Sequence, residues 1–141
     1  MNQFCQQLPT PPGITRWSIL ALAGVFVLAG CQGDEPDEVN VPGGDPDRGA
    51  ELIISYQCGE CHYIPGIEDA DGRDAPGLQI WPNRAFVADS APNTPENVIA
   101  FIQNPAAVQP GSPMPDLGVS EEEARDITAY LFTLRGPEGR R

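Results

Sequence analysis

The 141-residue chain contains no lysine, one histidine and two methionines. Its eight basic residues are all arginines, and 20 acidic residues outnumber them to give a formal net charge of −12. Nucleic-acid binding needs a basic surface, so this balance argues against a nucleic-acid partner. The absence of a second histidine or any lysine also limits which side chains can bind a metal. The four cysteines, Cys5, Cys31, Cys58 and Cys61, form no disulfide framework, since two of them fall in or beside a leader segment.

Residues 17–30, WSILALAGVFVLAG, form the longest apolar run. The run is shorter than the roughly 20 residues that span a bilayer, but it suits the hydrophobic region of a signal peptide, with Arg16 before it. Its end, Leu28 to Cys31, resembles the lipobox of bacterial lipoproteins, in which the cysteine is lipidated and becomes the mature N-terminus. We therefore expect residues 1–30 to be removed and Cys31 to carry the lipid. The alternatives are an ordinary signal peptide and an uncleaved anchor.

The remaining chain divides by composition. Residues 31–44 are acidic and lack periodicity, which predicts a lipidated N-terminus followed by a flexible tether. Residues 45–135 form the predicted domain and residues 136–141 a C-terminal tail. The protein is thus expected to be exported and lipid-anchored to a bacterial membrane, facing the periplasm or the cell exterior. The sequence does not say which membrane.

Three segments carry helical signals. They run from Pro46 to about Tyr56, from Pro95 to Gln103 and from Glu121 to Leu134. Each follows a good capping residue, and the third has a capping box formed by Ser120 and Glu123. The residues expected to face the core repeat at intervals of three and four: Ala50, Ile53, Ile54 and Gln57; Val98, Phe101 and Ile102; Ile127, Tyr130, Leu131 and Leu134.

Long loops rich in glycine and proline, 64–93 and 104–119, separate these helices, and no β pattern is visible. A loop of 30 residues counts against independent folding of a small domain. A large apolar cofactor among the loops would resolve that conflict. The predicted class is all-α, with three main helices and long loops around a cofactor.

Residues 58–62, CGECH, match the C-x-x-C-H pattern of c-type haem attachment. Two residues between the thiols let both sulfurs reach the two vinyl groups on one porphyrin edge, and the next residue then lies beneath the iron. This predicts one covalent haem c, bound by Cys58 and Cys61, with His62 as an axial ligand. The alternatives are a redox C-x-x-C, half a zinc site and chance. However, a thioredoxin-like site needs a βαβ context, and a zinc site needs a fourth protein ligand.

Met114 is the candidate for the sixth iron ligand by elimination. No second histidine or lysine exists, and Met1 is lost with the leader. Prolines on both sides of Met114 stiffen its loop. A lone methionine is more often a gap filler in a core, but here the prolines and the cofactor favour ligation. Two protein ligands leave no open iron position, which favours one-electron transfer, and a thioether raises the potential.

At this point residues 45–135 resemble class I cytochrome c. The elements come in the family's order: a helix running into CGECH, a loop with Ala-Pro-Gly-Leu at 75–78, a helix, a methionine loop, and a last helix ending in Ala-Tyr-Leu at 129–131. Residues 93–131 are especially similar to the cytochrome c domains fused to subunit II of haem–copper oxidases. The copper domain has no counterpart here, so we expect a separate donor or accessory subunit.

The resemblance implies roles around the haem. Pro76 matches the proline whose carbonyl accepts a hydrogen bond from the haem histidine, and Leu78 lies in the same loop. Arg84 stands where related domains place an arginine near a haem propionate, and Trp81 would donate its indole N–H there. The plainer alternatives are a turn proline, a surface charge and a core aromatic.

The resemblance also implies a close helix crossing at Gly49 and Tyr130. The family's docking ring of lysines cannot be carried over, because this chain has no lysine. Docking would then use an apolar patch around the haem edge, or a basic partner.

The leading hypothesis is a single-electron carrier and not an enzyme, passing electrons to or from a membrane respiratory complex such as a terminal oxidase. A permanent haem subunit of a larger oxidoreductase or photosynthetic complex is the main alternative. A ligand-binding haem enzyme or gas sensor is a third. The sequence does not reveal the partner, the potential, the direction of electron flow or the oligomeric state.

Overall fold

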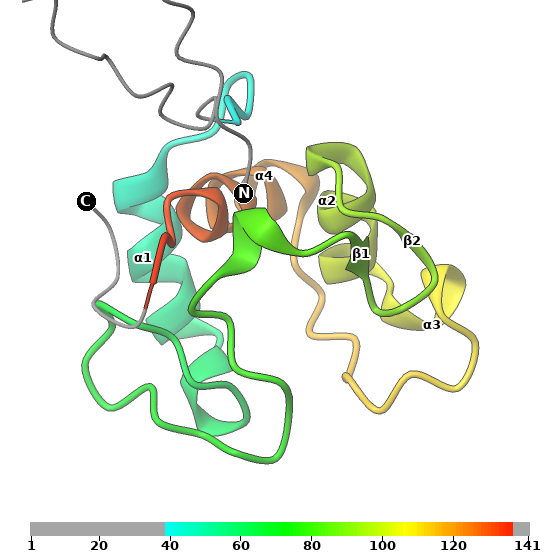
Figure 1. The fold of residues 1–141 in the computed structure, drawn as a ribbon, viewed down its shortest axis with the longest axis horizontal. Helices are drawn as coiled ribbons and strands as arrows, with labels where there is room; N and C mark the ends of the chain where they lie inside the picture. Colours follow the sequence, from blue (N-terminus) through cyan, green and yellow to red (C-terminus); the bar gives the residue numbers. More distant parts are fainter. Residues whose placement is uncertain (1–38, 137–141) are drawn as a thin grey trace, which may run out of the picture. The chain divides into compact units, whose positions relative to one another are not determined.

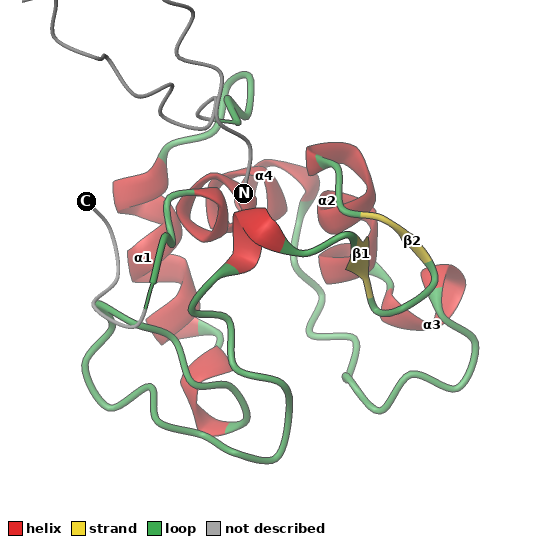
Figure 2. Cartoon of the chain, in the orientation of Figure 1, coloured by secondary structure: helices red, strands yellow, loops and turns green. Residues whose placement is uncertain are grey.

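The computed structural model describes residues 39–136, and helices and loops make up most of this part of the chain. The predicted leader, Cys31, most of the predicted tether and the tail after Gly136 lie outside the described residues. The helices are α1 (Pro46–Ser55), α2 (Pro95–Gln103), α3 (Pro105–Val108) and α4 (Glu121–Phe132), with 3-10 turns η1 (Cys58–Glu60) and η2 (Trp81–Asn83). A hairpin joins β1 (Phe86–Val87) to β2 (Ala91–Pro92). Figure 2 shows how much of the chain is loop, as an all-α fold with long loops predicts.

The predicted helices are α1, α2 and α4. Helix α2 has the predicted bounds, whereas α1 and α4 end earlier, at Ser55 and Phe132. Their starts follow from the caps: the Asp45 side chain accepts hydrogen bonds from two backbone N–H groups, and the capping box of Ser120 and Glu123 is present. Cap chemistry is local, which is why the starts could be read from the sequence.

Helices α1 and α4 cross at very short range (Figure 1). A Cβ placed on Gly49 would lie 2.1 Å from the backbone oxygen of Asp126, so only glycine fits at the crossing. Beside it, Asp126 is 2% exposed, accepts a hydrogen bond from Asp45 N–H at 2.8 Å, and pairs with Arg48 at 3.3 Å. The close crossing expected at Gly49 is therefore present. Further along α4, the Tyr130 hydroxyl donates to the carbonyl of Pro65, in the loop after the haem motif.

The core forms where α1, α2 and α4 meet. All four residues predicted to form the inner face of α4 are buried, as are Val98 and Ile102 on α2. The predicted inner face of α1 is partly wrong. Ile53 is buried, but Ile54 is 58% exposed and Gln57 is also exposed, because Gly49 and Ile53 turn toward α4 and carry Ile54 outward.

Two further expectations need correction. The loop 64–93 contains the β1–β2 hairpin, although no β pattern was visible, because strands of two residues are too short to show alternation. The predicted tether also ends earlier than residue 44. Val41 is buried, and Gly44 packs so closely on α4 that a Cβ there would lie 2.8 Å from the Ala129 Cβ. Residues 41–44 therefore belong to the folded domain.

Within residues 39–136, none of the helices has both the length and the apolar character needed to cross a membrane.

Candidate haem site

The C-x-x-C-H motif lies on a tight turn directly after α1. Gln57 adopts a left-handed backbone conformation (φ 56°) that ends the helix and starts η1. The N–H groups of Cys61 and His62 then both donate to the carbonyl of Cys58, the latter at 3.0 Å. This single turn brings together the two thiols and the imidazole, as the sequence spacing requires. Cys61 is exposed and Cys58 is half-buried.

The two cysteines differ in their surroundings. Burial raises the pKa of the Cys58 thiol, and the nearby Cys61 adds to the effect. The described residues contain no group of three or more His, Cys, Asp or Glu side chains placed to hold a metal ion.

The loop after the motif folds back along it. Backbone N–H groups of Gly72, Ala75 and Leu78 donate to carbonyls of residues 59, 61 and 63 at 3.0, 3.0 and 2.8 Å. Two glycines permit this approach. A Cβ on Gly59 would lie 2.7 Å from Ala70, and one on Gly72 would lie 2.4 Å from the Glu60 oxygen. The sequence reasoning missed both glycines, because only the folded loop shows what lies opposite them.

This fold-back places Pro76 beside the histidine. Its carbonyl oxygen lies 2.8 Å from His62 Nδ1, so the contact implied by the family resemblance is present. A carbonyl only accepts, which means that Nδ1 must carry the proton. The lone pair of the neutral ring is then on Nε2, the atom that the sequence argument assigned to the iron.

Trp81 and Arg84 form a second part of the site, on and after η2. The guanidinium carbon of Arg84 lies 5.2 Å from the centroid of the Trp81 ring, and its Nη2 donates to the carbonyl of Gly77. The indole Nε1 of Trp81 and Nε of Arg84 are buried and have no hydrogen-bond partner. Leaving a buried donor unpaired costs about 1–3 kcal/mol. Two unpaired donors on neighbouring, stacked side chains, one of them cationic, fit a carboxylate such as a haem propionate.

The remaining predicted residues are Leu78 and Met114. Leu78 is buried in the core cluster. Met114 is partly buried, and its backbone N–H donates to Ser112 Oγ at 3.3 Å. In Figure 1 the loop that carries Met114 (yellow to orange) and the loop that follows the haem motif (green) extend from the helices on the same side.

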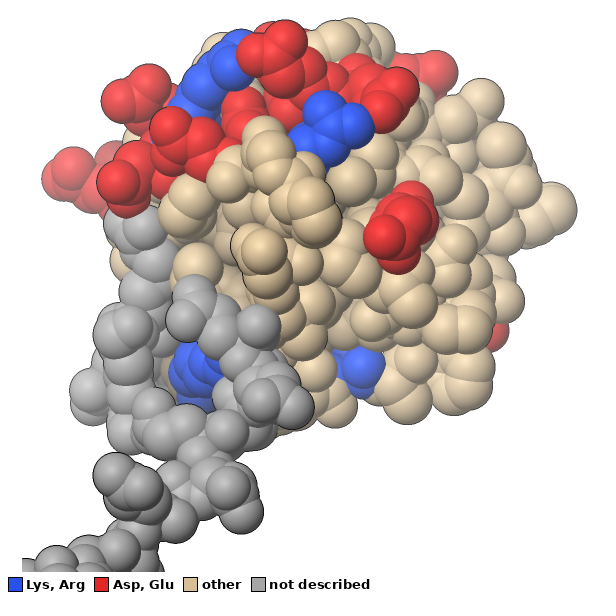
Figure 3. Space-filling model, turned by 90° about the horizontal axis from the view of Figure 1, so that it is seen from above, with Lys and Arg blue, Asp and Glu red and all other residues tan. Residues whose placement is uncertain are grey.

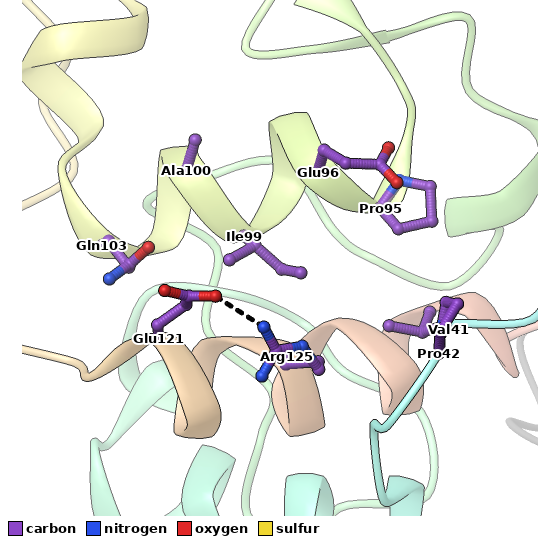
Figure 4. Close-up of a pocket in the computed structure, with 9 residues that line it drawn as sticks. All are labelled: Val41, Pro42, Pro95, Glu96, Ile99, Ala100, Gln103, Glu121 and Arg125. Atoms are coloured by element: carbon purple, nitrogen blue, oxygen red, sulfur yellow. Dashed lines mark hydrogen bonds and ion pairs between the residues drawn. The ribbon is translucent and has the colours of Figure 1, made fainter.

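A separate hollow of about 340 Å³ lies between α2, α4 and residues 41–42 (Figure 4). Its lining includes Ile99, Glu96 and the Glu121–Arg125 ion pair, but none of the predicted haem residues. This hollow is not part of the candidate site.

Comparisons with known proteins agree on one family. The cytochrome c family model matches residues 46–135. A protein named cytochrome c from Theileria annulata is 31% identical over 107 residues, which cover 69% of this chain and 91% of that protein. Cytochrome c oxidase subunit 2 from Alkalihalophilus pseudofirmus is 29% identical over 90 residues, covering 63% of this chain and 25% of that protein. The same subunit from Bacillus subtilis is 30% identical over 92 residues, which cover 62% of this chain and 26% of that protein.

The chain thus spans about a quarter of the length of the oxidase subunits that it matches. The family match instead covers the whole segment from the start of α1 to just beyond α4. The chain belongs to the cytochrome c family of haem-binding electron-transfer proteins, and its fold is the all-α fold of class I cytochrome c.

Proposed function

We propose that this cytochrome is a single-electron carrier with one covalent haem c, attached at Cys58 and Cys61 and ligated by His62 and Met114. The observation that supports this most directly is the geometry of His62. Its Nδ1–H is held by Pro76 at 2.8 Å, which leaves Nε2 available as a ligand on the same turn as the two thiols. The haem, when bound, supplies a one-electron iron couple.

The residues of the chain have separate tasks in this proposal. Pro76 fixes the tautomer and the plane of the imidazole, which makes His62 a better ligand. Trp81 and Arg84 direct their unpaired N–H groups at a propionate and keep that charge from being buried alone. Buried side chains such as Leu78 exclude water from the same region. Met114 closes the sixth position, which keeps oxygen and other small ligands off the iron.

We further propose that the mature protein is anchored by a lipid on Cys31 and that its partner is a membrane respiratory complex. The oxidase subunits among its relatives support such a partner. They also favour a second candidate function, a permanent haem subunit of a larger complex. Stoichiometric co-purification with an oxidoreductase after mild detergent extraction would favour the subunit. Recovery of the cytochrome alone would favour the carrier.

A redox titration followed by optical spectra tests the axial assignment. Met114→Ala is expected to lower the midpoint potential, because a thioether stabilises Fe(II). It should also let the reduced protein bind CO at neutral pH. Gln109→Ala, in the same loop, is the control and should leave the spectrum unchanged. If Met114→Ala kept the wild-type spectrum and potential, methionine ligation would be refuted. CO binding by the wild-type protein would favour the sensor alternative.

A further inference from the structure

Asn93 binds the turn that carries Trp81 and Arg84 through three hydrogen bonds. Its backbone N–H donates to the carbonyl of Ala85 at 3.0 Å. Its side-chain Nδ2 donates to the carbonyls of Trp81 at 2.9 Å and Arg84 at 3.2 Å. One residue therefore holds the backbone of both residues whose side chains carry the buried, unpaired donors.

The orientation of the Asn93 amide is fixed by chemistry. Two carbonyl oxygens face it, and a carbonyl only accepts, so the NH₂ group must point toward them. An isolated 3-10 turn such as η2 is a weak element. Its own closure consists of Arg84 N–H to the Trp81 carbonyl at 3.1 Å and Asn83 N–H to the Ile80 carbonyl at 3.0 Å. The bonds from Asn93 reinforce this closure.

Asn93 is itself held in place by the element that follows. Thr94 caps α2 through its hydroxyl, and Pro95 is the first residue of the helix. Because α2 packs on α4 in the core, the amide of Asn93 is attached to the rigid part of the fold. The turn over residues 81–85 contacts α4 directly through η2, and the bonds from Asn93 attach it to the start of α2 as well.

We propose that Asn93 is a positioning residue for the haem. Asn93 fixes the turn that carries Trp81 and Arg84, so that the free N–H groups of these two side chains hold one propionate. This inference rests on the proposed function. The Arg84 guanidinium offsets the propionate charge, and a positive charge near an iron centre favours its reduced form. Loosening the turn weakens that effect and lowers the midpoint potential.

The test measures the midpoint potential and the thermal stability of the haem-loaded protein. Asn93→Ala removes both side-chain bonds and is expected to lower the potential. Asn93→Ser keeps a hydrogen-bond donor on a shorter side chain, so its midpoint potential should lie between those of Asn93→Ala and the wild type. Asn97→Ala is the matched control, since Asn97 Nδ2 also donates to a carbonyl of this segment, that of Pro92 at 2.9 Å, but binds neither Trp81 nor Arg84. It should leave the potential unchanged.

A double-mutant cycle shows whether Asn93 acts through the two donors. Asn93→Ala should shift the potential less in a Trp81→Phe or Arg84→Lys background than in the wild type. If the Trp81→Phe and Arg84→Lys variants fail to load haem, the midpoint potentials of Asn93→Ala, Asn93→Ser and Asn97→Ala in the wild-type background still test the proposal. An Asn93→Ala variant that keeps the wild-type midpoint potential and loses only thermal stability would overturn the proposal. The proposal would also be overturned if Asn93→Ala lowered the potential as much in the Trp81→Phe and Arg84→Lys backgrounds as it does in the wild type. A wild-type protein that never acquires haem would overturn the proposed function as well.

Discussion

At the scale of single residues, the Glu123 carboxylate accepts several hydrogen bonds near the start of α4. Its Oε2 accepts hydrogen bonds from the backbone N–H and the hydroxyl of Ser120, at 3.0 and 2.6 Å, and from the Tyr56 hydroxyl at 3.0 Å. The bond to Glu123 raises the pKa of Tyr56. The bonds from Ser120 and Tyr56 lower the pKa of the Glu123 carboxyl below its ordinary value of 4.5.

A lowered pKa in the fold means that folding favours the ionised carboxylate. This stabilisation is complete above the ordinary pKa of 4.5 and is lost as the pH falls through the lower, folded-state pKa. We expect Glu123→Gln to be less stable than the wild type at pH 7, with a difference that shrinks in acid. Tyr56→Phe removes one of the bonds and should show a weaker pH dependence. Thermal unfolding of the haem-loaded protein from pH 7 to pH 3 measures both. A difference that stays constant with pH would contradict this account.

The haem motif shows what the sequence could reveal at this scale. Residues 58–62 carry their chemistry in their spacing, so the turn that brings the thiols and His62 together could be expected from the sequence alone. Pro76 could be expected only through the family resemblance. Asn93 could not be expected, because its side chain binds carbonyls nine and twelve residues earlier. A single sequence gives no sign of such pairs.

At the scale of elements, the α1–α4 crossing depends on Gly49. A Cβ at this position would lie 2.1 Å from a backbone oxygen of α4, and backbone cannot move aside as a flexible side chain can. We expect Gly49→Ala to destabilise the protein by about 1–3 kcal/mol, the usual cost of overpacking a core. Gly136→Ala is the control, since nothing lies within 4 Å of a Cβ there. Denaturant unfolding measures both. Equal stability of the two variants would contradict the close crossing.

The β1–β2 hairpin carries strain that a substitution can relieve. Its turn places two consecutive non-glycine residues, Ala88 and Asp89, in the left-handed region, with φ values of 51° and 53°. Asparagine tolerates this conformation better than alanine, and such turns favour Asn-Gly.

We expect Ala88→Asn to stabilise the protein by about 1 kcal/mol. This value is the lower end of the cost of holding one non-glycine residue in the left-handed region. Ala85→Asn, just before the hairpin, should give no gain. Denaturant unfolding compares the two variants. An Ala88→Asn variant no more stable than Ala85→Asn would contradict the assignment of strain to this turn.

The elements that the sequence missed are short or non-local. Helix α3 has four residues, Pro105–Val108, which is too few for a helical pattern to repeat. The hairpin turn lacks the Asn-Gly signal that marks such turns. Val41 reads as part of an acidic tether, but it is buried because α4 offers it a surface. In contrast, the starts of α1, α2 and α4 follow from Asp45, Thr94 and Ser120, which act within one turn.

At the scale of the whole molecule, acidic charge dominates. Red acidic side chains gather toward one side of the face shown in Figure 3, with a few blue arginine atoms among them. Of the arginines, Arg48 forms an ion pair with Glu122, and Arg125 forms one with Glu121. The formal net charge of −12 already counts these arginines, so the excess of acidic residues remains. A partner that docks through a negative surface of its own would therefore be repelled.

This charge predicts how the protein exchanges electrons with small reagents. Oxidation of the reduced protein by a cationic metal complex should slow as salt is added, because salt screens the attraction. Oxidation by an anionic complex should become faster as salt is added, because salt screens the repulsion. Stopped-flow rates at several ionic strengths measure both trends. Trends in the opposite directions would show that a positive surface lies around the electron-transfer edge, contrary to the lysine-free sequence.

The central claim is that one haem is joined covalently to Cys58 and Cys61. Intact mass spectrometry of the mature protein from its own host, with a pyridine haemochrome spectrum of the same sample, tests it most directly. We predict a mass equal to the polypeptide, its N-terminal lipid and one haem, which stays attached in acidified acetone. A colourless protein with the mass of the polypeptide alone, or a haem released by that extraction, would contradict the account.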